Sequence, residues 1–275
     1  MQSGDLLLRD YATRIFLKAV GIDINPFKEP EQFKQACHDT NTRFNGGQDL
    51  VRYQLASVED RRDWDEDVVL ATMNLAGKLG MRHGESPLTG KFDLIIASGG
   101  ARLAAMNRAC YAVQAILDNR ATTSLIVLAG STRAIRDDER PSLCNFAPDA
   151  KTEFDLYVEA EKRISDRHPD IPLLLVRKDN PKAGNDDIID EVMDAYNKRH
   201  PNNRQISVAM VTTRIYTIGL ELDMARAAKR HEWRRFLAAG HPSEPIMLFE
   251  RVISTYFSEC LTTLRKAAMA AAEDC

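Results

Sequence analysis

Two short segments combine glycine with hydroxyl and guanidinium side chains, a combination that suits anion binding. The first is Ser98-Gly99-Gly100-Ala101-Arg102 and the second is Gly130-Ser131-Thr132-Arg133. Glycine lets a backbone approach a ligand closely, hydroxyls donate hydrogen bonds, and arginine forms paired hydrogen bonds to phosphate or carboxylate oxygens. Neither segment is a GxGxxG or P-loop motif, so the pattern predicts an anion site without naming the ligand. For the first segment, the alternative is a tight strand-to-helix turn with a solvated Arg102.

Two later segments could add polar groups to the same site. Thr212, Thr213 and Arg214 place two hydroxyls and a guanidinium together, with an exposed arginine at a helix start as the alternative for Arg214. Asn185 follows a glycine turn and is a candidate hydrogen-bond donor to a ligand. Either Asn185 or Asp186 could instead cap the helix that begins there.

One carboxylate, Glu153, is the candidate for catalysis. Thr152 and Glu153 open a predicted helix, where the positive end of the helix dipole stabilises a carboxylate. Glu153 could act as a general base toward water, orient a ribose hydroxyl or bind a cation, and the alternative is a capping role. The acidic run 137–139, in the long loop after Gly130, fits a solvated surface better than a metal site.

The histidines and cysteines suggest neither a metal site nor a disulfide framework. The six histidines are scattered without metal-ligand spacing, and the five cysteines stand far apart with no CxxC pair. No Ser-His-Asp or Cys-His arrangement can be assembled from sequence position. We therefore predict no resident metal site and a reducing, cytoplasmic setting. Cys110 lies among apolar residues of a predicted helix, so we interpret it as a small core residue.

Short apolar runs come directly before the candidate segments, as expected for buried strands that end at a ligand site. We predict strands at 92–97, 124–129, 172–176, 206–211 and 246–249, and helices at 101–117, 152–167, 186–198, 215–230 and 251–271. Alternating apolar strands and helices indicate a parallel sheet covered on both faces. The prediction is a doubly wound, mainly parallel, five-stranded Rossmann-like α/β domain. Its ligands would bind beyond the carboxyl ends of the strands, where the candidate residues stand.

Residues 1–88 have a different, helical pattern. Apolar positions recur at helical spacing over residues 5–20 and 63–79. We therefore expect an N-terminal helical extension over residues 1–88 and the α/β domain over residues 89–275. The first apolar stretch is interrupted by charged residues, so it predicts neither a signal peptide nor a membrane anchor.

Composition is that of an ordinary globular chain. The 275 residues are 44% hydrophobic and 28% charged, with a net charge of -3, which gives no general attraction to nucleic acid or to anionic membranes. The basic stretch 226–235 contains Trp233 and could touch RNA. The favoured alternative is an amphipathic helix face whose long side chains cover apolar surface.

The order of these loop features resembles the YdcF-like (SanA/ElyC-related) family over about residues 90–235. That family has a Gly-rich first loop, a Gly-Gly or Gly-Ser second loop, a Ser/Thr-Glu-Ala helix start, an Asn-Thr motif and a Val-Thr-Ser strand end. The matching positions are Gly99 with Gly100, Gly130 with Ser131, Thr152 with Glu153, Asn185, and Val211-Thr212-Thr213. The chain departs from the family pattern at Asp186, where the family has Thr, and at Ile215-Tyr216 and Gly219, where it has Tyr-His-x-x-Arg.

The resemblance implies a Rossmann-like fold with a small-molecule site, and one family member is similar to a binder of S-adenosylmethionine. We expect a cytoplasmic protein of YdcF-like type that binds a nucleotide, S-adenosylmethionine or another phosphate-containing metabolite, with hydrolase and transferase chemistry both open. The alternative is a non-enzymatic ligand sensor or partner-binding module. We expect neither a nucleic-acid partner nor a membrane partner, and leave a divalent cation and a homo-oligomer open.

Overall fold

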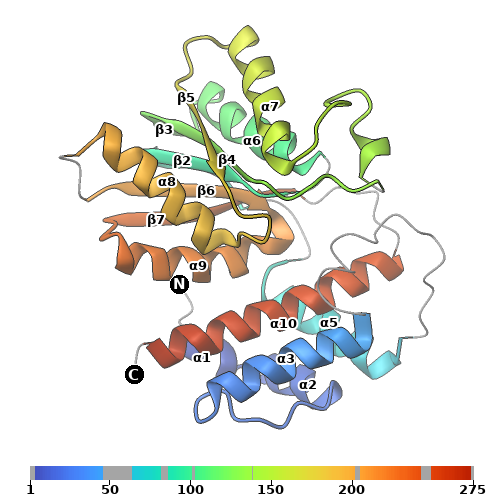
Figure 1. The fold of residues 1–275 in the computed structure, drawn as a ribbon. Helices are drawn as coiled ribbons and strands as arrows, with labels where there is room; N and C mark the ends of the chain where they lie inside the picture. The colour runs from blue at the N-terminus through green and yellow to red at the C-terminus, as the bar shows by residue number, and fades with distance from the viewer. Residues whose placement is uncertain are drawn as a thin grey trace. The chain divides into compact units, whose positions relative to one another are not determined.

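The chain forms two compact units, each of which is described here by itself. The computed structural model describes residues 4–45, 64–81, 86–100, 103–137, 139–201, 205–242 and 249–273. One unit is α/β and comprises Gly84–Ser243, and the other is helical and comprises Met1–His83 with Glu244–Cys275. Figure 1 labels the elements of both.

The α/β unit is built on a five-stranded parallel sheet. Its strands are β2 (Leu94–Ser98), β4 (Ile126–Ser131), β5 (Leu173–Lys178), β6 (Ser207–Thr213) and β7 (Arg235–His241). They lie in the order β5-β4-β2-β6-β7, and every neighbouring pair is parallel. Numbered along the chain this is 3-2-1-4-5, the order of a doubly wound Rossmann-like sheet, whose order reverses between β2 and β6. The predicted fold class is confirmed.

Helices cover both faces of this sheet (Figure 1). Helices α6 (Ala104–Leu117) and α7 (Glu153–Arg167) lie on one face, and α8 (Asn185–Arg199) and α9 (Thr217–Arg230) lie on the other. In β2 the alternate residues Ile95 and Ala97 pack toward α6 and α7, while Leu94 and Ile96 pack toward α8 and α9. Both faces of the strand are buried, which is why its sequence is a continuous apolar run. A small parallel pair, β1 (Gly90–Phe92) and β3 (Ala121–Thr123), completes the unit with two 3-10 turns, η1 (Arg140–Ser142) and η2 (Arg214–Tyr216).

The predicted last strand is wrong. The fifth strand is β7 at Arg235–His241, whereas the predicted run 246–249 lies outside the described residues except for Phe249, which begins a helix. Residues 235–241 pair with β6 over their whole length. The sequence pattern missed this strand because it begins with the polar Arg235 and ends with Gly240 and His241, although its central residues are apolar. Two predicted helix starts are early by two to three residues, since α6 begins at Ala104 and α9 at Thr217.

The helical unit consists of α1 (Gly4–Arg9), α2 (Tyr11–Ala19), α3 (Pro30–Asn45), α5 (Glu66–Lys78) and α10 (Phe249–Glu273). The single helix predicted at 5–20 is two helices, because Asp10 is extended and caps α2 by accepting from the amide of Ala12. The C-terminal helix α10 packs against α1, α3 and α5, and the fully buried rings of Phe16 and Phe257 meet edge to face. Contacts therefore group residues 244–275 with the N-terminal helices, whereas the sequence pattern assigns them to the α/β domain.

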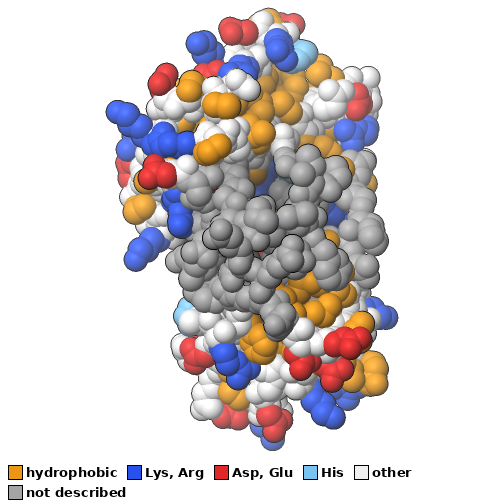
Figure 2. Space-filling model, turned by 90° about the vertical axis from the view of Figure 1, so that its right-hand side faces the viewer, with side chains coloured by type: hydrophobic (Ala, Val, Ile, Leu, Met, Phe, Trp, Pro, Cys, Tyr) orange, Lys and Arg blue, Asp and Glu red, His pale blue; other side chains and the backbone are white. Residues whose placement is uncertain are grey.

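On the face shown in Figure 2, acidic, basic and hydrophobic side chains are interspersed among the described residues. Figure 2 shows acidic and basic side chains on both the upper and the lower part of one face. Among the described helices, none combines the length and apolar content that a membrane crossing requires.

Candidate functional site

Three strand ends meet on the α6 and α7 side of the sheet, next to the reversal of strand order. The last core residues that β2, β6 and β7 direct toward those helices are Ala97, Val211 and Ala239. Thr213 and His241 follow two residues later in β6 and β7 and therefore lie on the same side. Gly99 directly follows β2, and a Cβ on it would stand 3.1 Å from Nη1 of Arg108. Thr213 is directly paired with His241 in the sheet. This edge is where a doubly wound fold binds its ligands.

Two glycines shape the turn after β2. Gly99 has φ +67° and Gly100 has φ +105°, values that side chains with a Cβ rarely adopt. A Cβ on Gly100 would stand 2.7 Å from the Cβ of Ala104 and 3.1 Å from Nη1 of Arg108. The turn thus needs glycine both for its backbone and for the guanidinium that approaches it. Arg102, which the sequence nominated beside these glycines, lies outside the described residues.

That guanidinium belongs to Arg108 of α6, which is only 6% exposed. Its Nη1 donates to the carbonyl oxygen of Ser98 at 2.6 Å, and its Nη2 donates to Oγ1 of Thr213 at 3.5 Å. Nε has no partner, and no carboxylate of the described segments lies within ion-pair distance of this guanidinium. Because burying an unneutralised charge is costly, the arrangement suits an anion.

Buried polar atoms without partners gather at this edge. Seven side-chain nitrogen or oxygen atoms of the described residues are buried and unpartnered, and four of them come from Ser98 (Oγ), Arg108 (Nε), Arg214 (Nε) and Thr217 (Oγ1). Native proteins satisfy nearly all such atoms, so an unpartnered Nε on the buried Arg108 indicates a ligand or ordered water. Ser98 alternates with Ala97, so its Oγ points toward α8 and α9, away from Arg108. Helix α6 adds backbone donors here, since its N-cap residue Leu103 offers no side-chain hydrogen bond.

Thr213 and His241 form a hydroxyl and imidazole pair at the same edge. His241 Nδ1 lies 2.8 Å from the carbonyl oxygen of Pro242, which can only accept, so Nδ1 carries the proton. When the ring is neutral, Nε2 is an acceptor, and it lies 3.1 Å from Oγ1 of Thr213. In that state the hydroxyl of Thr213 donates to Nε2.

Tyr157 of α7 holds the glycine turn from the other side. Its hydroxyl donates to the carbonyl oxygen of Gly99 at 2.8 Å, and burial strongly raises the pKa of this phenol, with Arg108 acting in the opposite direction. Helix α7 comes this close because Gly130 at the end of β4 has no side chain. A Cβ there would stand 2.9 Å from Cα of Phe154.

Glu153 lies at the N-terminus of α7 but does not cap it. Thr152 is the cap, and it forms a reciprocal capping box with Asp155. Glu153 is buried, and its carboxylate accepts from the hydroxyl of Ser131 at 2.5 Å and from the amide of Ser131 at 3.4 Å. The structure therefore brings two nominated residues, Ser131 and Glu153, into direct contact beyond the end of β4.

Other nominated residues have internal partners. Arg133 makes two hydrogen bonds, of 3.1 and 3.2 Å, to the carboxylate of Glu139, which is fully buried. The interpretation of the acidic run as wholly solvated is wrong at Glu139, because this residue pairs with Arg133 inside the loop. Thr132 continues the β4 and β5 ladder through its amide, which donates to the carbonyl of Lys178 at 3.1 Å.

Asn185 and Thr212 lie toward the opposite face of the sheet. The side chain of Asn185 donates to Asp223 of α9 at 2.7 Å, and the cap of α8 is Gly184 rather than Asn185 or Asp186. Thr212 is buried and alternates with Thr213, so it follows Met210 toward α8 and α9. Neither residue faces Arg108.

Two arginines of the basic stretch predicted from residue 226 pair with carboxylates of α8. Arg226 pairs with Asp186 and Asp223, and Arg230 pairs with Asp186 and Asp190. These contacts fasten α9 to α8, so the two arginines serve packing between helices.

Sequence reasoning missed Arg108, Tyr157 and His241. A usable signal existed for Arg108, which falls on the same helical stripe as Ala105, Ala109 and Ala112 and so belongs to a buried face. His241 was missed because β7 was predicted too late in the chain. Nothing local to Tyr157 distinguishes it from an ordinary core aromatic residue.

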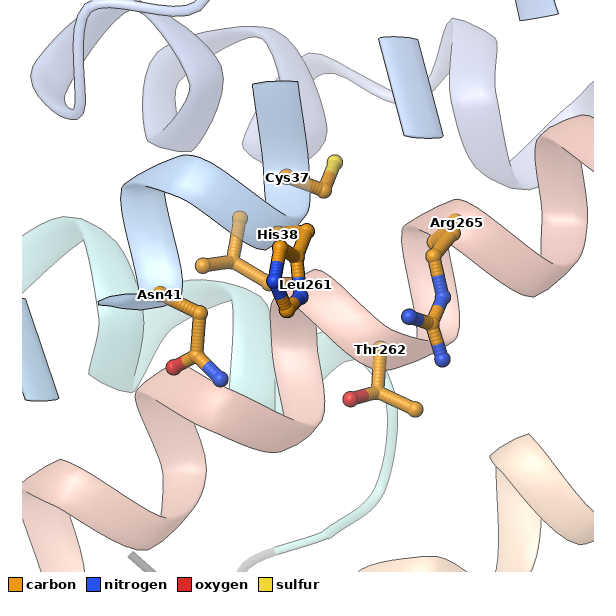
Figure 3. A pocket seen from close by; sticks show the side chains of 6 residues that line it. All are labelled: Cys37, His38, Asn41, Leu261, Thr262 and Arg265. Carbon is orange, nitrogen blue, oxygen red and sulfur yellow. The ribbon is translucent and has the colours of Figure 1, made fainter. Parts of the chain in front are cut away.

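A small pocket also lies in the helical unit, between α3 and α10 (Figure 3). It is lined by Cys37, His38, Asn41, Leu261, Thr262 and Arg265. Its volume of about 10 Å³ accommodates a single water molecule, so it is too small for a metabolite. In the described parts of the chain, no group of three or more histidine, cysteine, aspartate or glutamate side chains has the arrangement of a metal site.

No protein-family model and no curated protein sequence matches this chain.

Proposed function

We propose that the α/β unit binds a phosphate-containing small molecule at the carboxyl edge of β2 and β6. The observation that carries this proposal is the buried guanidinium of Arg108, which has no carboxylate partner in the described residues. A phosphate group would neutralise it and would accept its free Nε–H. The positive φ values at Gly99 and Gly100 keep that turn free of side chains, so the anion could approach the backbone.

Several donors around Arg108 favour phosphate over a carboxylate. The first amides of α6 receive no side-chain hydrogen bond from the N-cap residue Leu103. Together with Nε they offer more donors than the two oxygens of a carboxylate can use in one plane, whereas a phosphate presents three or more oxygens. S-adenosylmethionine fits less well, because its sulfonium is positively charged and would stand near a buried cation.

Within this class we favour a nucleotide or another phosphorylated metabolite, consistent with the resemblance to the YdcF-like family. Glu153 would serve as the ligand of a cation, since its carboxylate is not used by the helix cap. Hydrolase and transferase chemistry are both compatible with this assignment. The free thiols Cys37, Cys110, Cys144 and Cys260 are consistent with our proposal of a cytoplasmic location.

The proposal is tested by ligand-dependent thermal stability and calorimetry of the full chain. The panel contains inorganic phosphate, pyrophosphate, AMP, ATP and S-adenosylmethionine. A ligand at about 100 times its Kd should raise the free energy of unfolding by about 2.7 kcal/mol. We expect the phosphorylated compounds to give this shift and S-adenosylmethionine to give none.

Two variants locate the binding. Arg108→Met should abolish the shift, because it removes the guanidinium while keeping an unbranched side chain. Arg234→Gln is the matched control, since it removes a guanidinium at the start of β7, at the opposite edge of the sheet, where it bonds to Ser207. Retention of the shift in Arg108→Met would refute the proposed site.

A further inference from the structure

The Thr213 and His241 pair has the geometry of an activated hydroxyl nucleophile, and anion binding alone does not require it. Activation of a hydroxyl needs a base within hydrogen-bond reach and a third group that orients the base. Here Nε2 of His241 lies 3.1 Å from the hydroxyl oxygen, and the Pro242 carbonyl fixes the ring through Nδ1 at 2.8 Å. Both groups stand on the side of the sheet that Arg108 occupies.

We infer that Thr213 is the nucleophile, and His241 its general base, in the hydrolysis of a phosphate monoester. This inference rests on the proposed anion site at Arg108. Two contacts place the hydroxyl beside that site. Arg108 Nη1 bonds to the Ser98 carbonyl, while Nη2 of the same guanidinium lies 3.5 Å from Oγ1 of Thr213. A phosphate held by Arg108 would thus have its phosphorus next to the hydroxyl.

Arg108 also favours the charge that develops in the reaction. A neighbouring guanidinium stabilises both the forming alkoxide of Thr213 and the equatorial oxygens of the transferring phosphoryl group. Thr213 is partly exposed, whereas the neighbouring Thr212 is buried on the opposite face. A substrate could therefore reach the hydroxyl of Thr213 but not that of Thr212.

The reaction has two balanced steps. In the first, Oγ1 of Thr213 bonds to phosphorus and the bond from phosphorus to the ester oxygen breaks on the opposite side. The hydroxyl proton passes to Nε2 of His241 and from there to solvent, and the leaving alkoxide takes a proton from solvent. In the second, Nε2 takes a proton from water, the hydroxide attacks phosphorus, and the bond from phosphorus to Oγ1 breaks. The proton returns to Oγ1. The sum is a phosphate monoester plus water giving an alcohol plus inorganic phosphate, with no oxidant or reductant.

The test uses the full chain with p-nitrophenyl phosphate as the monoester. Release of p-nitrophenol measures turnover, and acid quenching followed by peptide mass spectrometry locates phosphate on the protein. Calorimetry with inorganic phosphate measures anion binding separately. We expect wild type to release p-nitrophenol and to carry phosphate on Thr213 after quenching.

Four variants separate the chemical role of the pair from a structural one. Thr213→Val should lose the phosphothreonine and at least about 100-fold of the turnover, with phosphate affinity changed only a few-fold. His241→Gln should slow phosphorylation by about 100-fold or more, the usual contribution of a general base. Thr213→Ser should restore the labelling, because it keeps the hydroxyl. Thr212→Val is the control and should match wild type.

Several outcomes would overturn the inference. These are turnover unchanged in Thr213→Val, phosphate on another residue, or a wild type that binds inorganic phosphate yet neither turns over nor becomes labelled. In all three cases the proposed anion site stands. If wild type fails to bind phosphate or any phosphorylated ligand, the proposed function itself fails.

Discussion

Arg108 carries a buried charge that no carboxylate of the described residues neutralises, whereas Arg133 forms an ion pair with the fully buried Glu139. The two arginines therefore predict opposite effects on stability. A functional group that is not compensated within the fold usually lowers the stability of the ligand-free protein. A structural ion pair has the opposite effect. Removal of one partner leaves the other charge buried and uncompensated, which lowers the stability of the protein.

We predict that Arg108→Met leaves the free energy of unfolding of ligand-free protein unchanged or raises it, by up to a few kcal/mol. Arg133→Met should lower it by about 3–5 kcal/mol, because Glu139 would remain buried without the guanidinium that neutralises it. Urea unfolding of both variants, without added anions, measures the difference. A large loss of stability in Arg108→Met would mean that its bonds to Ser98 and Thr213 are structural.

Burial governs the reactivity of the thiols. Burial raises the pKa of Cys37 to about 12, with Arg265 acting in the opposite direction, and it raises the pKa of Cys260 as well. Cys144 and Cys110 are exposed, so the interpretation of Cys110 as a core residue is wrong. The helix carrying Cys110 turns this side chain away from the Ala105 and Ala109 stripe.

We predict that iodoacetamide at about pH 8 alkylates Cys144 in the native protein but reaches Cys37 and Cys260 only after unfolding, because only the thiolate reacts. Peptide mass spectrometry over time gives the rates. Cys37 and Cys260 lie on α3 and α10, so native labelling of Cys37 at the rate of Cys144 would show that these two helices separate readily.

At the scale of elements, the start of α7 decides where Glu153 stands. Burial acts to raise the pKa of Asp155, but hydrogen bonds from the backbone amides of Lys151 and Thr152 and from the Thr152 side chain, with the charge of Arg177, hold it below its usual value. A carboxyl whose pKa is lowered by folding stabilises the native state above its unfolded pKa. That stabilisation is lost as the pH falls through the native pKa.

We predict that Asp155→Asn lowers the free energy of unfolding by about 1 kcal/mol at neutral pH, because the capping box is weakened. The difference from wild type should shrink as the pH falls below about 4, where Asp155 itself becomes protonated. Urea unfolding at several pH values tests this. A difference that stays constant down to acid pH would show that the charge of Asp155 contributes nothing to the cap.

At the scale of the whole molecule, each proposed chemical group lies in the α/β unit. That unit spans Gly84–Ser243 without interruption, whereas the helical unit needs both ends of the chain. Helix α10 supplies Phe257 to the core that α2 builds around Phe16. Along the sequence, the α/β unit is therefore inserted between the two segments that form the helical unit.

We predict that a fragment of residues 84–243 folds with a cooperative thermal transition and binds phosphate as the full chain does. A fragment of residues 1–83 should not fold, since it lacks the helix that covers α1, α3 and α5. Circular dichroism and calorimetry on the two fragments decide both points. A folded 1–83 fragment would show that α10 is dispensable to the helical core.

The sequence by itself determined the fold class and the edge of the sheet that carries polar groups. Apolar runs such as 94–97 and 126–129 are buried on both faces, and the residues that follow them leave the sheet at one edge, so periodicity and turn chemistry are enough. These are local properties, written within a few residues of each other.

Only the tertiary structure decided which side chains meet at that edge. Arg108 comes from the second turn of α6, His241 from β7 and Tyr157 from α7, and each reaches Gly99 or Thr213 across a long stretch of chain. It also decided that Arg133 turns to Glu139 and that α10 joins the N-terminal helices. Such partners depend on strand order and helix placement, which arise from contacts distant in sequence and leave no local pattern to read.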